Sequence, residues 1–263
     1  MIGAIAGDII GSVHEFVGTK SKEFELFHPM SHFTDDTVLT IAVAHRLLRG
    51  GDYVDLFHEY VDAHPRAGYG GSFFRWAMTR LRAPYQSWGN GSAMRVSPVG
   101  FAARTLEEAM AMARESAEVT HDHPHGIRGA QATAVAIFLA RTTHDKQAVR
   151  SHIEREFGYD LSTRLDEIRE DYVFDVSCEG SVPQSIIAFL ESTGYEDAVR
   201  NAISLGGDAD TMACIAGGIA EAHYGGVPEP IRQQAVVKLV PQMRIIVDEF
   251  TARFITRSGQ ESR

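Results

Sequence analysis

Apolar residues recur at helical spacing along almost the whole chain, and this pattern constrains the fold more than any other feature of the sequence. No convincing run of alternating apolar and polar residues is bounded by turn signals, so we expect few strands. Linkers are short, and no low-complexity stretch divides the chain. We therefore predict a single all-α domain over residues 1–263. Its clearest helices are expected at residues 38–48, from Thr105 onward, and at 127–141, 185–191, 195–205, 211–223 and 228–254, the last split near Pro241.

Two local signals add detail to this pattern. Thr105 begins a capping box with Glu108, which predicts a helix start at that point. Gly3, Gly7 and Gly11 recur every four residues and would line one face of a first helix. Because glycine has no Cβ, that face would let another helix or a ligand approach the backbone closely. Close packing in the core is the interpretation we favour.

Composition narrows the class of protein. Of the 263 residues, 44% are hydrophobic and 23% charged, which is typical of a globular domain and excludes a disordered or collagen-like chain. The net charge of −10 is poorly matched to a phosphate backbone, so nucleic acid is not expected as a main partner. Two cysteines are too few for a disulfide framework. Without a targeting segment or an apolar run of ~20 residues, the sequence predicts a cytoplasmic protein that does not enter a membrane.

Two acidic clusters stand directly before expected helices. The first is Thr34-Asp35-Asp36-Thr37, and the second is Asp208-Ala209-Asp210-Thr211, preceded by two glycines. Threonine and aspartate are favoured at helix N-termini, so helix capping would explain one acid at each site. Paired carboxylates repel one another unless something neutralises them, and a hard divalent cation would do so. From spacing alone, capping and metal binding remain equally open.

Five motifs follow one another in a specific order. They are Gly7-Asp8-x-x-Gly11 with Glu15, Phe33 to Thr37, Gly89 to Arg95, Thr120-His121, and Gly206 to Thr211. Together they resemble the ADP-ribosylglycohydrolase family, which includes dinitrogenase-reductase-activating glycohydrolase and the ADP-ribosyl-acceptor hydrolases. The resemblance extends from about residue 1 to about residue 227. It implies a compact domain of orthogonal helices, a centre of two Mg²⁺ ions (with Mn²⁺ as an alternative), and removal of ADP-ribose from modified acceptors.

The resemblance also implies roles for the acidic residues. Glu15 matches a glutamate that some members use near the scissile bond, as a general base or a metal-linked group, and Asp35 and Asp36 are assigned to catalysis with it. From the residues alone, the alternative for Glu15 is a surface or lid carboxylate. The positions that match the family's metal ligands are Thr34, Asp35, Asp36, Asp208, Asp210 and Thr211.

Three further segments match substrate contacts of the family. Trp88 stands where relatives often have a tyrosine, and an indole can also stack on adenine; on its own it would be read as a half-buried loop aromatic. The glycine-rich turn before residue 73 suits a diphosphate, as in the matching region of the family, although by itself it is better explained as a simple turn. Some relatives carry an acidic residue in this turn that has a catalytic role. This chain has none there, which favours Glu15 as the catalytic residue. The predicted substrate-binding residues are Gly68, Gly70, Gly71, Ser72, Ser87, Trp88, Gly89, Asn90, Gly91 and His121.

Two segments keep alternative interpretations. Residues 16–33 show no periodicity and would form either an ordinary loop or a mobile lid over a site. His121, His123 and His125 are spaced like zinc ligands, but no fourth ligand is evident, so a separate zinc site is disfavoured. His121 is expected to orient ligand or site backbone, as in the family's Thr-His motif.

The resemblance therefore predicts a Mg²⁺-dependent hydrolase that cleaves the C1″ glycosidic bond between ADP-ribose and an acceptor such as an arginine or serine side chain. Its partners would be an ADP-ribosylated protein or other modified acceptor, with ADP-ribose as the product, and it would be a monomer. One alternative is a catalytically weak ADP-ribose-binding protein, like crystallin members of the superfamily. The other is a different two-metal hydrolase acting on nucleotides.

Overall fold

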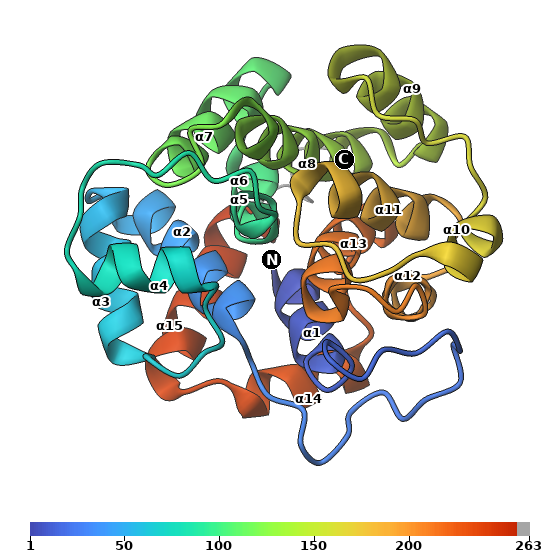
Figure 1. Ribbon diagram of the computed structural model, residues 1–263, viewed down its shortest axis with the longest axis horizontal. Coiled ribbons are helices and arrows are strands. Elements are labelled where there is room, and N and C mark those ends of the chain that lie inside the picture. Colours follow the sequence, from blue (N-terminus) through green and yellow to red (C-terminus); the bar gives the residue numbers. More distant parts are fainter. Residues whose placement is uncertain (257–263) are drawn as a thin grey trace.

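The computed structural model describes residues 1–256, and helices account for nearly all of its regular structure (Figure 1). Within that range the extended pairing is a single bridge between Gly89 and Ser177, so the prediction of an all-α fold is confirmed. The helices are α1 (Ile2–Gly11), α2 (Asp35–Arg49), α3 (Tyr53–Ala63), α4 (Gly71–Met78), α5 (Gly91–Met94), α6 (Ser97–Ala102), α7 (Leu106–Glu118), α8 (Pro124–Thr143), α9 (Lys146–Phe157), α10 (Leu165–Asp171), α11 (Cys178–Leu190), α12 (Tyr195–Ile203), α13 (Ala209–Tyr224), α14 (Glu229–Lys238), α15 (Pro241–Phe250) and a π-helical turn at Thr251–Ile255.

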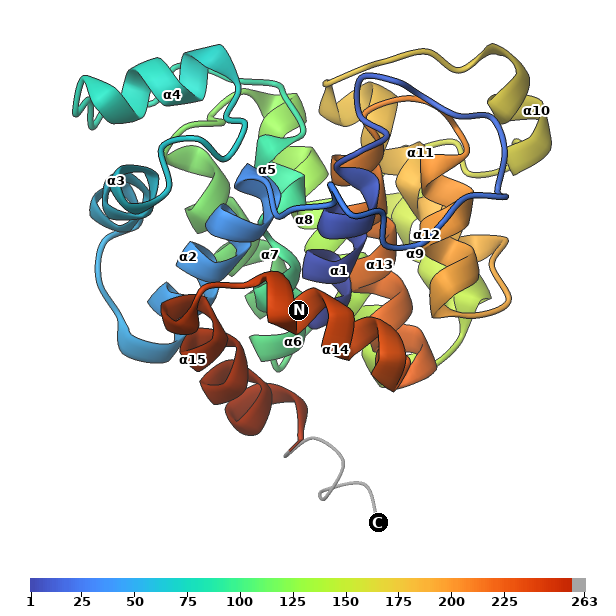
Figure 2. The same ribbon diagram turned by 90° about the horizontal axis from the view of Figure 1, so that it is seen from below.

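Helices α1 and α13 lie side by side at the centre of the molecule (Figures 1 and 2). Every residue of α1 is buried. A Cβ placed on Gly3 would lie 2.5 Å from the carbonyl oxygen of Gly217, and one on Gly7 would lie 2.1 Å from that of Ala213. A Cβ on Gly11 would lie 2.5 Å from the Cα of Asp210. The glycine face of the first helix therefore allows backbone-to-backbone packing in the core, as predicted.

The expected helices are present, and several begin or end a few residues away from the expected positions. Helix α2 begins at Asp35, three residues before Val38, because the Thr34 hydroxyl accepts a hydrogen bond from the Asp36 N–H and caps the helix. Helix α11 begins at Cys178, seven residues before the expected start at Ser185. Its first half is not expected from the sequence because a proline, here Pro183, is unusual inside a helix. Thr105 caps α7 through the Glu108 N–H, as the capping box predicts.

Helices α3, α9 and α10 and the short α5 and α6 are not among those expected from the sequence. Helices α5, α6 and α10 are short and α9 is mostly polar, whereas α3 has an apolar face that the sequence analysis did not recognise. Helix α9, for example, buries only Val149, Ile153 and Phe157. A narrow apolar stripe of this kind is a weak signal, because packing against a neighbouring helix, rather than intrinsic propensity, supplies most of the stability of such elements.

Residues 16–33 contain no helix and run along the outside of α12 and α14. Lys22 forms an ion pair with Asp197, and the Arg200 guanidinium donates to the carbonyl oxygens of Lys22 and Phe24 at 2.9 Å each. The ammonium group of Lys238 donates to the carbonyl oxygen of Ser31 at 2.6 Å. These contacts hold residues 22–31 as an ordinary loop, and they do not involve the residues nearest Glu15.

Within residues 1–256, no helix has both the length and the apolar character needed to cross a membrane.

The glycine contact of α1 can be tested by substitution. We expect Gly7→Ala to lower the free energy of unfolding by about 1–3 kcal/mol, because the added methyl group would overlap the Ala213 carbonyl and force the two helices apart. Urea unfolding measures this. Gly194→Ala is the control, since its Cβ would have no atom within 4 Å and its backbone is extended. Equal unfolding midpoints for the two variants would show that α1 and α13 can separate without cost.

Candidate active site

A buried carboxylate, that of Asp8, connects the end of α1 to the start of α2. Asp8 is fully buried in an otherwise apolar helix. It accepts hydrogen bonds from the Thr34 N–H at 3.0 Å, the Thr34 hydroxyl at 2.7 Å and the Thr37 N–H at 3.1 Å, and also from the Thr37 hydroxyl. The first turn of α2 is thereby fixed against α1. As a result the two acids of the first cluster, Asp35 and Asp36, occupy a defined place.

The second acidic cluster reaches the same place from α13. The Thr211 hydroxyl donates to Asp36 Oδ1 at 3.2 Å, although the two residues are 175 positions apart in the sequence. The other oxygen of this carboxylate, Asp36 Oδ2, is buried and has no hydrogen-bond partner. An unpaired carboxylate oxygen away from water is costly. Such an oxygen is suited to bind a cation.

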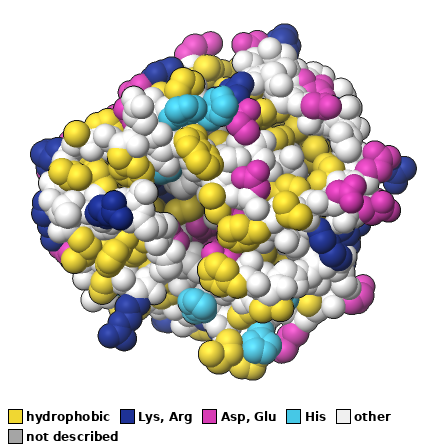
Figure 3. All heavy atoms as spheres, in the orientation of Figure 1, with side chains coloured by type: hydrophobic (Ala, Val, Ile, Leu, Met, Phe, Trp, Pro, Cys, Tyr) yellow, Lys and Arg dark blue, Asp and Glu magenta, His cyan; other side chains and the backbone are white. Residues whose placement is uncertain are grey.

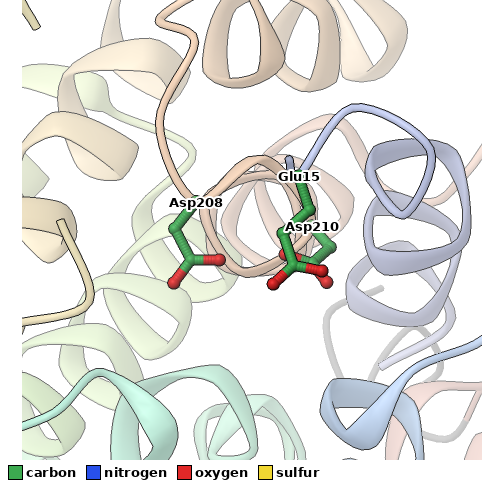
Figure 4. Close-up of side chains that lie close together, drawn as sticks. All are labelled: Glu15, Asp208 and Asp210. Atoms are coloured by element: carbon green, nitrogen blue, oxygen red, sulfur yellow. The ribbon is translucent and has the colours of Figure 1, made fainter. Parts of the chain in front are cut away.

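One group of side chains in residues 1–256 has the geometry to hold a metal ion: Glu15, Asp208 and Asp210 (Figure 4). One carboxylate oxygen from each lies within 4.8 Å of the others. Glu15 comes from the turn after α1, and the two aspartates come from the start of α13 (Figure 4). Asn90 supports the group, because its side-chain amide donates to Asp208 Oδ2 at 2.8 Å. Glu15 therefore lies among candidate metal-binding groups.

The crowding of carboxylates raises their pKa values. Burial raises the pKa of Asp36 and Asp210 well above the usual range for aspartate, and the charges of neighbouring carboxylates raise them further. Asp35 behaves in the same way next to Asp8 and Asp208. The pKa of Glu15 is raised to about 7 by burial and by the charges of Asp208 and Asp8. The folded chain therefore holds several carboxylates close together and away from water.

This donor set fits a hard divalent cation. It offers carboxylate and hydroxyl oxygens without cysteine or histidine, which favours Mg²⁺, Mn²⁺ or Ca²⁺ over zinc. The buried Asp36 oxygen without a hydrogen-bond partner also suits a cation ligand. Helix capping accounts for the presence of Thr34, because its hydroxyl accepts a hydrogen bond from the Asp36 N–H and donates one to Asp8. It does not explain the convergence of the four aspartates at 35, 36, 208 and 210.

The carboxylates lie at the bottom of a cavity of about 430 Å³, a size typical of small-molecule sites. Figure 3 looks into this hollow, with acidic side chains deep inside it. All ten predicted substrate-binding residues line the cavity, as do Glu15, Asp35, Asp36, Asp208, Asp210 and Thr211. Thr34 is the one predicted site residue that does not line it, because its side chain points to Asp8.

The loop of residues 87–91 forms one wall and is held in place by α11. Its backbone pairs with the chain before α11: the Asn90 N–H donates to the Val176 carbonyl at 2.8 Å, and the Cys178 N–H donates to the Trp88 carbonyl at 3.0 Å. The indole of Trp88 remains 52% exposed. Anchored backbone beneath an exposed aromatic ring gives this wall a preformed stacking surface.

A buried arginine and histidine support that wall. His121 is buried, its Nδ1 lies 2.8 Å from the Thr120 hydroxyl, and burial together with Arg95 holds its pKa well below the usual value. Arg95 donates to the Ser116 carbonyl at 2.6 Å and stacks on the Phe57 ring, 4.6 Å from its centroid. Arg95 Nε and Nη1 have no hydrogen-bond partner. A positive charge thus stands in the cavity wall without a carboxylate paired to it.

Sequence reasoning missed several members of this site. Asp8 had a signal, since a lone acid inside an apolar helix must be paired. Tyr85 and Gln86 also line the cavity, but nothing in their local sequence indicates it. Arg95 lines it too; it ends the motif of residues 89–95, but no role was predicted for it. His123 caps α8 by accepting from the His125 N–H. Neither His123 nor His125 belongs to a candidate metal group in the described part of the chain.

The chain is similar to known proteins over most of its length. The family model described as ADP-ribosylglycohydrolase matches residues 1–259. The chain is 29% identical to the ADP-ribosylhydrolase ARH3 of Mus musculus, covering 89% of this chain and 85% of that one. It is 30% identical to ARH3 of Gallus gallus, covering 73% and 70%.

A solved structure gives the same picture of the fold. It is titled ADP-ribosylglycohydrolase-related protein complex and superposes with a TM-score of 0.72 at 24% identity, over 95% of each chain. The family model spans nearly the whole sequence, including every residue of the acidic cluster and of the cavity wall. The chain therefore belongs to the ADP-ribosylglycohydrolase family.

Proposed function

We propose that the chain is a divalent-metal-dependent hydrolase that cleaves the bond between C1″ of ADP-ribose and a modified acceptor. The observation that carries this proposal is a single cavity joining a carboxylate cluster to a wall of glycines, polar groups and an exposed indole. Membership of the ADP-ribosylglycohydrolase family supports the same reaction. So do the curated relatives, whose name describes hydrolysis of ADP-ribosyl groups.

The carboxylates would hold two Mg²⁺ ions, with Mn²⁺ as an alternative. Asp35, Asp36, Asp208, Asp210 and Thr211 are the proposed ligands, joined by Glu15, whose carboxylate lies beside those of the second cluster. Thr34, proposed from the sequence as a ligand, instead positions Asp8 and α2. When bound, such ions polarise hydroxyl groups and lower the pKa of a nearby water.

Glu15 is our candidate for moving the proton. In hydrolysis the oxygen of water bonds to C1″, the bond from C1″ to the acceptor breaks, and its electron pair stays with the acceptor atom. One proton must travel from the water to that atom. A carboxylate held at the reacting bond can accept that proton and pass it to the leaving atom. Glu15 lines the cavity beside Asp208 and Asp210, where this transfer would occur.

The opposite wall would bind the nucleotide. Trp88 offers its exposed face to adenine. The backbone N–H groups at Gly70 and Gly71, where α4 begins, suit the diphosphate, and the unpaired guanidinium nitrogens of Arg95 add a positive charge to the same cavity. Bound in this way, ADP-ribose would present its distal ribose to the carboxylates. The acceptor would then lie at the cavity mouth.

One assay separates this proposal from its rivals. The protein is incubated with Mg²⁺ and proteins ADP-ribosylated on arginine or on serine, and the small products are separated and identified. Release of intact ADP-ribose supports the proposal. Release of AMP or phosphate would indicate a different nucleotide hydrolase. Binding of ADP-ribose without any release would indicate a binding protein.

Metal binding should stabilise the fold in a pH-dependent way. The raised carboxyl pKa values mean that protons compete with the cation, so the increase in Tm caused by Mg²⁺ should be larger at pH 8 than at pH 6. Differential scanning fluorimetry with Mg²⁺ or EDTA measures this. Asp210→Asn should remove most of the increase, whereas Asp248→Asn, on the surface of α15, should keep it. An Asp210→Asn protein with the full Mg²⁺ response would contradict the assignment.

Loss of the proton-moving group should affect turnover most. We expect Glu15→Gln to lower kcat by about 10²–10⁴-fold while ADP-ribose affinity changes little. Glu23→Gln, an exposed glutamate in the same loop, is the matched control. Isothermal titration with ADP-ribose gives the affinity, and product release gives kcat. A Glu15→Gln enzyme with near-wild-type kcat would rule out this role.

The stacking surface is tested through ADP-ribose itself. Trp88→Ala should weaken binding by about 1–3 kcal/mol if the indole stacks on the base. Leu81→Ala, which removes an exposed apolar side chain outside the cavity, should leave binding unchanged. Unchanged affinity for the Trp88 variant would mean that adenine binds elsewhere.

A further inference from the structure

A second, smaller cavity adjoins the proposed catalytic one. It has a volume of about 240 Å³ and is lined by Glu15, Phe16, Val17, Gly18, Phe174 and Gly206. Its volume is below the roughly 300–1,000 Å³ of small-molecule sites. Glu15 lines both cavities, so the small one opens directly beside the carboxylate cluster. Apart from Glu15, it contains no charged side chain.

The small cavity lies in an exposed apolar surface. Phe16 is 85% and Val17 84% exposed, and the ring of Phe174 lies 6.3 Å from that of Phe16 at an interplanar angle of 26°. Val176 and Trp88, also exposed, continue this surface into the lining of the large cavity. We call these five residues the apolar rim. Apolar residues gathered at the mouth of a cavity mark a binding surface, because exposing them to water is otherwise unfavourable.

The segments that form the small cavity are fixed to one another. The Lys20 ammonium group donates to the carbonyl oxygens of Tyr172 at 2.5 Å and of Leu205 at 2.6 Å. The Tyr172 hydroxyl in turn donates to the Gly180 carbonyl at 2.6 Å, on α11. The Lys20 ammonium group therefore joins the three chain segments around the small cavity, which contain Lys20, Tyr172 and Leu205. A surface ordered in this way loses little conformational entropy when a partner binds.

We propose that the small cavity receives an apolar side chain of the acceptor polypeptide, next to the residue that carries ADP-ribose. This inference rests on the proposed function, because a scissile bond at Glu15 leaves the acceptor at the place where the two cavities meet. The volume and the apolar lining suit one aliphatic side chain. An anionic membrane surface is disfavoured by the net charge of −10. The apolar rim would thus select ADP-ribosylated polypeptides by the sequence beside the modified residue.

The test compares two ADP-ribosylated peptides that differ only beside the modified residue, with leucine in one and glycine in the other. Hydrolysis kinetics are measured on both, and binding is measured on matched peptides with a non-hydrolysable carbon linkage. Wild-type protein should show a KM and a Kd about tenfold lower for the leucine peptide. Phe16→Ser combined with Phe174→Ser should abolish this preference without changing the Kd for free ADP-ribose. Val237→Ser, which removes an exposed valine on α14, should keep it.

The two measurements separate the inference from the proposed function. Equal KM and Kd values for both peptides in an active wild-type protein would overturn the inference and leave the function standing. A Kd preference for leucine without any release of ADP-ribose would overturn the function and leave the docking surface standing. A concentration-dependent dimer in light scattering that the double serine variant abolishes would show that a second copy of the chain, rather than an acceptor, covers the apolar rim.

Discussion

The site depends on the close contact between α1 and α13, which brings carboxylates together against their mutual repulsion. The glycine face of α1 lets the backbone of α13 approach within the space a Cβ would occupy, and Gly11 lies against the Cα of Asp210 itself. Two helices with ordinary side chains at these positions would be held further apart. Glu15 follows directly from α1, so the same contact brings it to Asp208 and Asp210.

A second connection runs through Asp8. Its carboxylate receives hydrogen bonds from two threonines of the α2 start, and this fixes Asp35 and Asp36 opposite the start of α13. Acids at the N-termini of two helices also gain from the helix dipoles, which offset part of the repulsion among them. The repulsion that remains, together with burial, raises the pKa values of these carboxylates. Divalent cations bound between them would reduce the repulsion further. Functional sites typically hold like charges close together, and the stability that this costs is offset by packing elsewhere in the fold.

The cavity divides into parts with different chemistry. Its floor is acidic, one wall offers backbone N–H groups, an indole and an unpaired guanidinium, and beyond Glu15 the surface becomes apolar. Each part is formed by loops or helix ends whose positions depend on the packing of α1 against α13. Under the proposed function, the acidic floor would face the distal ribose, the wall would bind the base and the diphosphate, and the apolar surface would bind the acceptor polypeptide.

The sequence by itself determined the all-α fold and the residue types of the site. Helical periodicity depends on neighbours within a few residues, and the clusters at residues 34–37 and 206–211 are legible because acids in pairs before helices are unusual. The ordered motifs also identified the loop of residues 87–91. Tertiary structure alone decided which carboxylates lie beside Glu15, that the Thr34 hydroxyl donates to Asp8, and that Tyr85 and Gln86 line the cavity. These facts depend on which faces of distant segments meet in the folded chain, and no local pattern in the sequence carries that information.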